Sequence, residues 1–217
     1  GEWRFEVKFD GYRLLARVDG TRVQLVTRNG NDWTDKLPTI RDAVAALDVL
    51  SAWIDGEIVV INERGVPDFN RLQNAFDRRS TADVRYFVFD LPYFGGHDLR
   101  TLPQGERRRA LEALVGDAPR GPLQLSAELE ADSASVLDAA CRMHLEGVIA
   151  KRTDAPYVSR RSETWLKLKC MLRQEFVIGG YTDRANHPSE VGALLLGVHD
   201  DDGRLMPVGR VGTGWDT

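Results

Sequence analysis

The chain has 217 residues, of which 42% are hydrophobic, and a formal net charge of −4 at pH 7. This length suffices for one large core, or for one domain and part of a second. No apolar run approaches the roughly twenty residues of a membrane span, and no apolar segment with a basic flank opens the chain. Two cysteines, Cys141 and Cys170, cannot make a disulfide framework and lack the spacing of a zinc site, so a cytoplasmic protein is expected.

The acidic balance argues against a nucleic acid partner, because phosphate neutralisation needs clustered Lys and Arg. A positive cleft can nevertheless lie on an acidic protein. Candidate basic surfaces are Arg71, Arg78–Arg79, Arg107–Arg109 and Arg160–Arg161. For Arg107–Arg109 the favoured interpretation is a solvated helix face.

The first three predicted strands cover residues 3–8, 12–18 and 22–27, where apolar and polar side chains alternate. Asp19-Gly20 is a hairpin sequence, so the three strands are predicted to form a meander. Lys8 then lies where the first strand ends.

Helices and strands are mixed in the next part of the chain. The predicted elements are a helix over residues 38–50 with Ile40, Val44, Leu47 and Leu50 at helical spacing, a strand at 54–61, a helix at 68–77 capped by Asp68, a strand at 84–91, and helices at 104–115 and 133–143. Beyond residues 171–173 the pattern is all-β. The class is therefore α+β, with antiparallel sheets and flanking helices.

Six stretches carry the functional pattern, and all occur in one order along the chain. They are Lys8-x-Asp10-Gly11-x-Arg13, Thr27–Gly30, Asp55-Gly56-Glu57, Tyr86–Asp90, Glu146–Lys151 and Trp165–Lys169. Together they resemble the successive nucleotidyl-transfer motifs of ATP-dependent DNA ligases, and the connecting segments look most like the ligase module of bacterial ligase D. A solvated lysine on a strand edge is an alternative for the first stretch, but it leaves the other five unexplained.

The resemblance implies an ATP-grasp-like nucleotidyltransferase (adenylation) domain over residues 1–172. It also implies an OB-fold segment over residues 173–217, and about forty residues are too few for a complete five-stranded barrel. In similar ligases a later basic motif orients pyrophosphate. Since no residue here matches it, the chain is expected to join an already adenylated nick better than it reacts with ATP.

The resemblance also implies a reaction in three steps. Lys8 attacks the α-phosphate of ATP to form lysyl-AMP, AMP passes to the 5′-phosphate of a DNA nick, and the 3′-hydroxyl seals the strand. Lys167 and Lys169 share one strand face and, with a bound Mg²⁺ or Mn²⁺, are expected to favour the neutral Lys8 amine and hold the α-phosphate. Trp165 is expected to support this strand from the core.

For the base, Phe89 is the candidate stacking platform, with Val148 packing on the opposite face. Phe87 points to the same side of its strand as Phe89, so one of the two is expected to be core. By resemblance Glu6 reads the adenine amino group, with the Val7 backbone beside it.

Carboxylates are the candidate metal ligands, because hard oxygen donors suit magnesium or manganese. The resemblance assigns this role to Glu57 and Glu146, and Glu57 can also contact the ribose. The structural alternatives are a solvated carboxylate at a strand end for Glu57 and a partner for Arg152 in the case of Glu146.

Four further residues receive roles from the resemblance. Arg13 contacts the ribose, Arg161 helps with the phosphates, and Arg28 meets the 5′-phosphate of the nick, a task that suits a bidentate guanidinium. Asp10 organises the later steps, or is simply the turn residue before Gly11.

Double-strand break repair by non-homologous end joining follows only from the resemblance. So do a Ku-type end-binding partner and polymerase or phosphoesterase modules in a longer chain. An RNA ligase or a GTP-using capping enzyme shares the lysine chemistry, and nucleotide preference separates these from a DNA ligase. A non-catalytic nucleic-acid-binding module is the alternative from another class, and a covalent adduct would exclude it.

Overall fold

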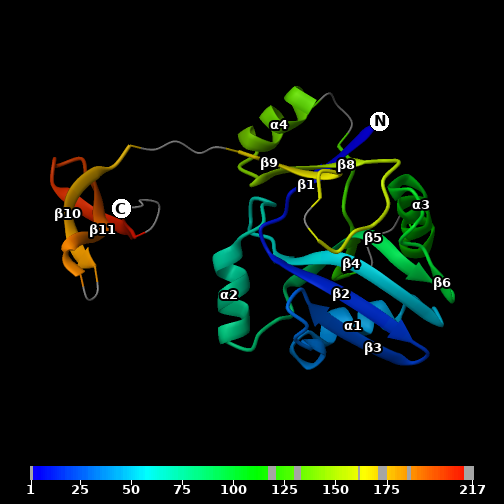
Figure 1. Cartoon of the computed structure of the whole chain (residues 1–217). Helices are drawn as coiled ribbons and strands as arrows, with labels where there is room; N and C mark the ends of the chain where they lie inside the picture. Colours follow the sequence, from blue (N-terminus) through cyan, green and yellow to red (C-terminus); the bar gives the residue numbers. More distant parts are fainter. Residues whose placement is uncertain are drawn as a thin grey trace. The chain divides into compact units, whose positions relative to one another are not determined.

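The computed structural model describes residues 2–116, 121–129, 133–160, 162–170, 175–184 and 187–212 (Figure 1). The chain divides into two compact units, Gly1–Cys170 and Met171–Thr217, and each is described by itself. Among the described residues, no helix combines the length and the apolar character that crossing a membrane requires. Arg161 lies outside the described residues, so its predicted phosphate role stays a prediction.

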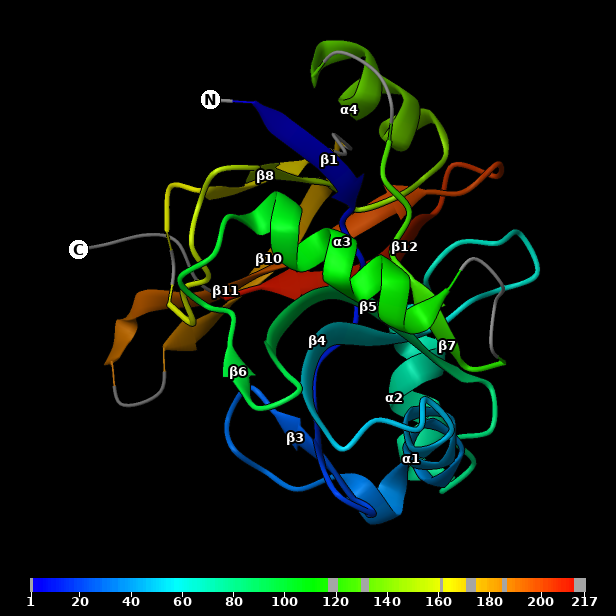
Figure 2. The same ribbon diagram turned by 90° about the vertical axis from the view of Figure 1, so that its right-hand side faces the viewer.

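The larger sheet of the first unit has the strand order β3-β2-β4-β5-β6, with β7 added in parallel beside β5. Its strands are β2 (Tyr12–Asp19), β3 (Arg22–Thr27), β4 (Ser51–Val60), β5 (Val84–Phe94), β6 (His97–Asp98) and β7 (Leu123–Leu125). The helices α1 (Pro38–Ala45), α2 (Phe69–Asp77) and α3 (Gln104–Val115) contact it, and a 3₁₀ turn, η1 (Thr34–Lys36), precedes α1 (Figure 2). Fully buried Leu14, Ile54 and Leu111 belong to the main core that this packing forms.

A smaller sheet holds β1 (Trp3–Val7), β8 (Gly147–Arg152) and β9 (Trp165–Lys169) in that order. Helix α4 (Ser133–Arg142) packs on it through Val136 and Ala140. The predicted meander is therefore wrong in its first strand, because β1 pairs with β8 and only β2 and β3 form the hairpin.

Gly11 marks the place where the chain changes sheets. A Cβ atom there would lie 2.1 Å from the Ile58 carbonyl oxygen, so only glycine allows this close approach to β4. Alternation within residues 3–18 fits two strands of one sheet equally well, which is why the pattern did not reveal the change.

The helices agree with the sequence except at one boundary. Helix α1 ends at Ala45, earlier than predicted, and Leu50, expected on its apolar face, is 85% exposed. Asp68 caps α2 as predicted, since its side chain accepts a hydrogen bond from the Arg71 backbone N–H at 3.0 Å.

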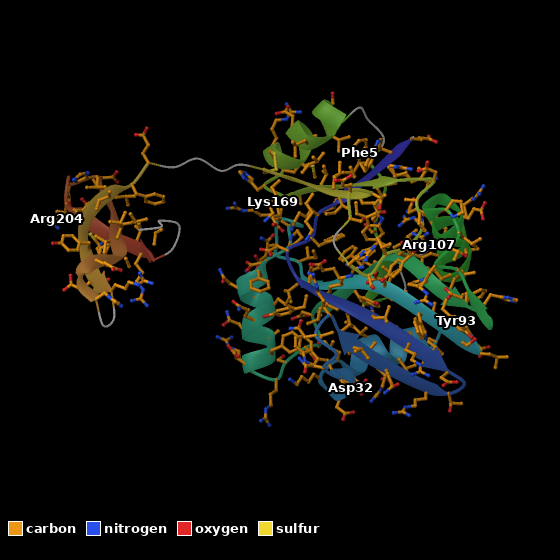
Figure 3. The ribbon with its side chains drawn as sticks, in the orientation of Figure 1. Phe5, Asp32, Tyr93, Arg107, Lys169 and Arg204 are labelled. Carbon is orange, nitrogen blue, oxygen red and sulfur yellow. A yellow bond between two sulfur atoms is a disulfide. The ribbon has the colours of Figure 1, made fainter. Side chains whose placement is uncertain are left out.

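The predicted solvated face at Arg107–Arg109 is wrong for two of the three arginines. Arg107 and Arg108 are buried and only Arg109 is exposed. Arg107 donates to both carboxylate oxygens of Asp90, at 2.8 and 2.9 Å (Figure 3 labels Arg107). The side of helix α3 that carries Arg107 and Arg108 faces β5. The carboxylates that pair with the two arginines offset the cost of burying their charges.

Cys141 and Cys170 form a disulfide that joins α4 to the residue after β9. A single disulfide is not a disulfide framework, and the separation of 29 residues between the two cysteines did not indicate that they would pair. It fixes the end of β9 against α4.

The second unit is an antiparallel sheet of β10 (Val177–Arg184), β11 (His187–His199) and β12 (Leu205–Val211), in that order. The described elements of this unit are all-β. Several of its apolar side chains are exposed, among them Ile178, Tyr181 and Val208.

Candidate active site

Most of the predicted site residues line one cavity of about 500 Å³ in the first unit. Those that do are Glu6, Val7, Lys8, Asp10, Arg13, Arg28, Glu57, Phe89, Glu146 and Lys167. Val148 and Lys169 are not among the lining residues. Residues far apart in sequence therefore meet here, as the resemblance implied.

Lys8 follows the last residue of β1, as predicted, and its side chain is 12% exposed. Its backbone N–H donates to the Gly147 carbonyl at 3.0 Å, which anchors it to β8. Gly147 has a φ of +146°, and a Cβ atom there would lie 2.0 Å from the Leu168 carbonyl oxygen, so glycine is needed. This backbone places the Lys8 ammonium in an ion pair with Glu146.

Glu146 also accepts from the Lys169 ammonium at 3.2 Å through its other oxygen. Burial raises the pKa of Glu146, but the hydrogen bonds from Lys8 and Lys169 outweigh this effect, and the net pKa lies below its ordinary value. The alternative partner is excluded because Arg152 pairs instead with Asp154 at 2.8 Å.

Strand β9 brings its lysines opposite the start of β8, with Lys169 paired to Gly147 and Lys167 to Ile149. Lys167 lines the cavity and Lys169 reaches it through Glu146 (Figure 3 labels Lys169). Trp165 lies at the next alternate position and lines the same cavity. Its predicted role as a core support is therefore wrong.

Glu57 lies opposite Arg13 in the pairing of β4 with β2. Burial raises the pKa of Glu57 to about 7, against 4.5 in the ordinary case, although Lys8 and Arg13 act in the opposite direction. Glu57 therefore titrates near neutral pH, which a solvated carboxylate at a strand end would not do.

Arg13 is fixed by two residues to which the sequence analysis gave no role. Its Nε donates to Asp55 Oδ1 at 3.0 Å, and the Tyr157 hydroxyl donates to Asp55 Oδ2 at 2.9 Å. Burial lowers the pKa of Arg13, but Asp55 outweighs it and the net pKa is raised. Asp55 stands in a quoted motif, so its carboxylate was a detectable candidate, whereas Tyr157 lies in a loop that no pattern marked.

An aromatic corner forms the wall expected to meet the base. Phe89 and Trp165 pack edge to face with centroids 5.8 Å apart, and the Lys151 ammonium lies 4.4 Å from each ring centroid. Phe87 instead stacks on Phe9 at 4.4 Å and does not line the cavity, so it is the packing residue of the pair.

The prediction that Val148 faces the base is wrong by one residue. Val148 is fully buried and packs with Val136 and Ala140 of α4, whereas Ile149 lines the cavity. Side chains alternate along β8, so Ile149 and Lys151 share one face and Val148 the other.

Glu6 is 3% exposed and accepts a hydrogen bond from Lys151 Nζ at 2.7 Å. Burial lowers the pKa of Lys151, and the nearby Glu6 carboxylate opposes this effect. Lys151 received no role from the sequence analysis, although it ends a quoted motif and follows Ile149 at the alternate position of β8.

The remaining predicted residues lie on turns at the cavity. Arg28 is exposed and stands with Asn29 and Asn31 in the turn after β3, where Thr27 Oγ1 accepts from the Asn31 N–H at 3.1 Å. Asp10 is exposed on the turn between β1 and β2. Arg28 is thus placed to meet an anionic group entering from solvent.

A family model described as the ATP dependent DNA ligase domain matches residues 1–169. The chain is 49% identical over 217 residues to the multifunctional non-homologous end joining protein LigD of Pseudomonas aeruginosa, covering 99% of this chain and 26% of that protein. It is 36% identical to the LigD of Mycolicibacterium smegmatis, covering 99% and 27%. The chain thus spans about a quarter of the length of these relatives.

Solved structures agree with the sequence relatives. The ligase domain of M. tuberculosis LigD has a TM-score of 0.69 at 38% identity, over 99% of this chain and 68% of that one. A mycobacterial DNA ligase D complexed with ATP and MES has a TM-score of 0.70 at 37% identity, over 98% and 67%. The mixed architecture of antiparallel sheets with flanking helices is that of ligase nucleotidyltransferase domains, and the chain belongs to the ATP-dependent DNA ligase domain family.

Proposed function

We propose that this chain performs the nucleotidyl-transfer chemistry of an ATP-dependent DNA ligase, with Lys8 as the nucleophile. The observation that carries the proposal is the position of Lys8. It directly follows a strand at a cavity that Glu57, Glu146 and Lys167 also line, and its ammonium is held by Glu146.

In the first step the Lys8 amine attacks the α-phosphorus of ATP. A nitrogen–phosphorus bond forms, the bond from the α-phosphorus to the bridging oxygen breaks, and pyrophosphate leaves. Before it can attack, Lys8 must leave its ion pair with Glu146 and lose a proton to solvent. Lys167, on β9 of the same sheet, lines the cavity and supplies positive charge where the phosphate becomes more negative.

The aromatic corner and Glu6 suit adenine. The Phe89 ring and Ile149 offer apolar surface to a flat base, and the Glu6 carboxylate is an acceptor for an exocyclic amino group. We assign the ribose contact to Arg13, whose guanidinium is held by Asp55.

Glu57 and Glu146 are the proposed ligands of Mg²⁺ or Mn²⁺. No cluster of three or more ligating side chains occurs in the described part of the chain, but magnesium is commonly held by one or two carboxylates together with substrate phosphates. Both glutamates line the cavity, so the donor set fits such an ion, which would neutralise phosphate charge when bound.

The later steps require a nicked or broken DNA duplex. Arg28 can make a bidentate contact with the 5′-phosphate that receives AMP, and Asp10, which lines the same cavity, is proposed to organise the later steps. Attack of the 3′-hydroxyl on the activated phosphorus then forms the phosphodiester and releases AMP.

The relatives named for non-homologous end joining support a role in double-strand break repair, on DNA in the bacterial cytoplasm. We extend the proposal to a longer protein in which this chain is the ligase module, with residues 173–217 contributing to an OB-fold domain. A Ku-type partner and polymerase or phosphoesterase modules are part of that proposal.

The decisive experiment is the intact mass of the protein before and after ATP with magnesium, and again after pyrophosphate. The expected result is the gain of one adenylyl group that pyrophosphate removes. Lys8→Ala should not gain it. Lys36→Ala, which removes an exposed lysine of η1, should behave like the parent.

Three other outcomes would replace the proposal. A guanylyl adduct formed in preference to an adenylyl adduct would favour a capping-type enzyme, and joining of RNA but not DNA nicks would favour an RNA ligase. Binding of nicked DNA with no adduct under any condition would favour a non-catalytic module.

A further inference from the structure

A cluster of buried polar atoms lies beside Glu6 and outside the cavity lining. Four side-chain atoms in it have no hydrogen-bond partner among the described residues: Gln104 Nε2 and Oε1, Arg108 Nη1 and Ser126 Oγ. Their three residues are at most 3% exposed. Unpartnered buried polar groups are rare in native proteins, and each needs an explanation.

The fold brings these residues to Glu6 from two directions. Gln104 and Arg108 lie one helical turn apart on the same side of α3. Ser126 follows β7, and its carbonyl accepts from Arg108 Nη2. The segment after Ser126 runs along β1. There the backbone of Glu128 forms an isolated antiparallel β-bridge with Glu6, and the Leu129 N–H donates to the Phe5 carbonyl at 2.8 Å.

The Arg108 guanidinium is held on two sides and directed at Glu6 on the third. Its Nε donates to Glu112 at 2.7 Å and its Nη2 donates to the Ser126 carbonyl. Nη1 lies 3.9 Å from Glu6 Oε1, the same oxygen that accepts from Lys151 at 2.7 Å. Both cations thus approach the same carboxylate oxygen, Oε1.

We propose that Arg108 is a positioning residue for base selection, which holds the Glu6 carboxylate as an acceptor for the amino group of adenine. The inference rests on the proposed function. Adenine presents an amino donor where guanine presents a carbonyl acceptor. A guanine carbonyl against Glu6 would leave two acceptors facing each other without a proton between them, which a water-excluded site penalises strongly.

Gln104 and Ser126 complete this arrangement as polar neighbours of Arg108. A buried water that joins Gln104, Arg108 Nη1 and Ser126 Oγ would satisfy the orphaned atoms, since such waters commonly have about three polar partners. The cluster then acts through Glu6 and not by contact with the nucleotide.

The test compares the dissociation constants of ATP and GTP by calorimetry without divalent metal, so that no covalent step is needed. For Arg108→Met we expect the preference for ATP over GTP to fall about tenfold, the effect of losing one charge-assisted contact. Arg108→Lys, which keeps the charge, should recover most of the preference.

The neighbouring Arg107 supplies a matched control. It is buried on the same helix, but it pairs with Asp90 and makes no described contact with Glu6. Arg107→Met should lose stability in urea and keep the parent preference for ATP. Arg108→Gln, which removes the charge but keeps a donor, replaces Arg108→Met if the latter does not fold.

An unchanged preference in folded Arg108→Met or Arg108→Gln would overturn the inference, as would an equal loss in Arg107→Met. If the preference responds as expected but Lys8 never becomes adenylated, the inference stands and the proposed transfer chemistry fails. If the parent binds neither nucleotide, both fail.

Discussion

The two sheets of the first unit are built on opposite principles. The larger sheet buries an apolar core against α1, α2 and α3, with fully buried side chains such as Leu14 and Ile54. The smaller sheet has a modest apolar core against α4, and charged side chains of β1, β8 and β9 line the cavity.

This contrast separates stability from chemistry. Apolar burial stabilises the fold in proportion to area, whereas Glu6, Lys151 and Lys8 are held by charge pairing across short strands. We therefore expect changes in the apolar core of the larger sheet to alter unfolding, and changes in the charged side chains at the cavity to alter the reaction.

The largest expected effect is that of Lys8→Arg. Arginine retains a positive charge for Glu146, so the free energy of unfolding should stay within about 1 kcal/mol of the parent, as for a partly exposed ion pair. The guanidinium stays protonated and cannot attack phosphorus, so adenylyl transfer should be abolished. Intact mass and urea unfolding check both parts, and an adduct on Lys8→Arg would remove the nucleophile assignment.

In the larger sheet, Leu14→Ala should have the reverse profile. Leu14 is fully buried in the main core, and its truncation should cost about 2–5 kcal/mol, the usual range for a core leucine. At urea concentrations below the unfolding midpoint, the folded fraction of Leu14→Ala should still be adenylated to completion. Loss of the adduct in fully folded Leu14→Ala would show that the two sheets do not divide stability and chemistry.

The same division explains what the sequence could predict. Strands β2 to β5 of the large sheet, the cap at Asp68 and helix α3 followed from local periodicity and capping residues. The pairing of β1 with β8 did not, because alternation fixes which face a residue takes within a strand and not which strand lies beside it.

Within the site, the motifs located the cavity but not every contact. Val148 was chosen from its position in the motif alone. The alternation of side chains along β8 instead places Ile149 at the cavity. Arg107 looked solvated because its carboxylate partner, Asp90, lies 17 residues away in sequence. For Arg108 the partner Glu112 stands one helical turn away, but the contacts with Glu6 and Ser126 that bury the guanidinium come from distant segments. Long-range charge pairing leaves no local pattern.

A smaller effect is expected from pH at Glu57, whose pKa rises from 4.5 to about 7 on folding. Between these values the folded state binds more protons than the unfolded state, so stability should fall as pH rises through this window and level off above it. Glu57→Gln cannot titrate and should lose this part of the slope.

The measurement for Glu57 is the urea midpoint of parent and Glu57→Gln at several values between pH 4.5 and 8. Subtracting the urea midpoint of Glu57→Gln from that of the parent cancels the contributions of groups that titrate in both proteins. Parallel curves across the window would contradict the raised pKa.

The smallest expected effect is that of Asp68→Ala at the start of α2, a helix that contacts the larger sheet. The Asp68 side chain accepts from the Arg71 N–H at 3.0 Å, and loss of such a cap costs about 1 kcal/mol. Asp68→Asn keeps an acceptor and should recover most of the loss in urea unfolding, while adenylyl transfer stays at the parent rate in both variants. A slower transfer in Asp68→Ala would mean that α2 takes part in the reaction and does more than cover the larger sheet.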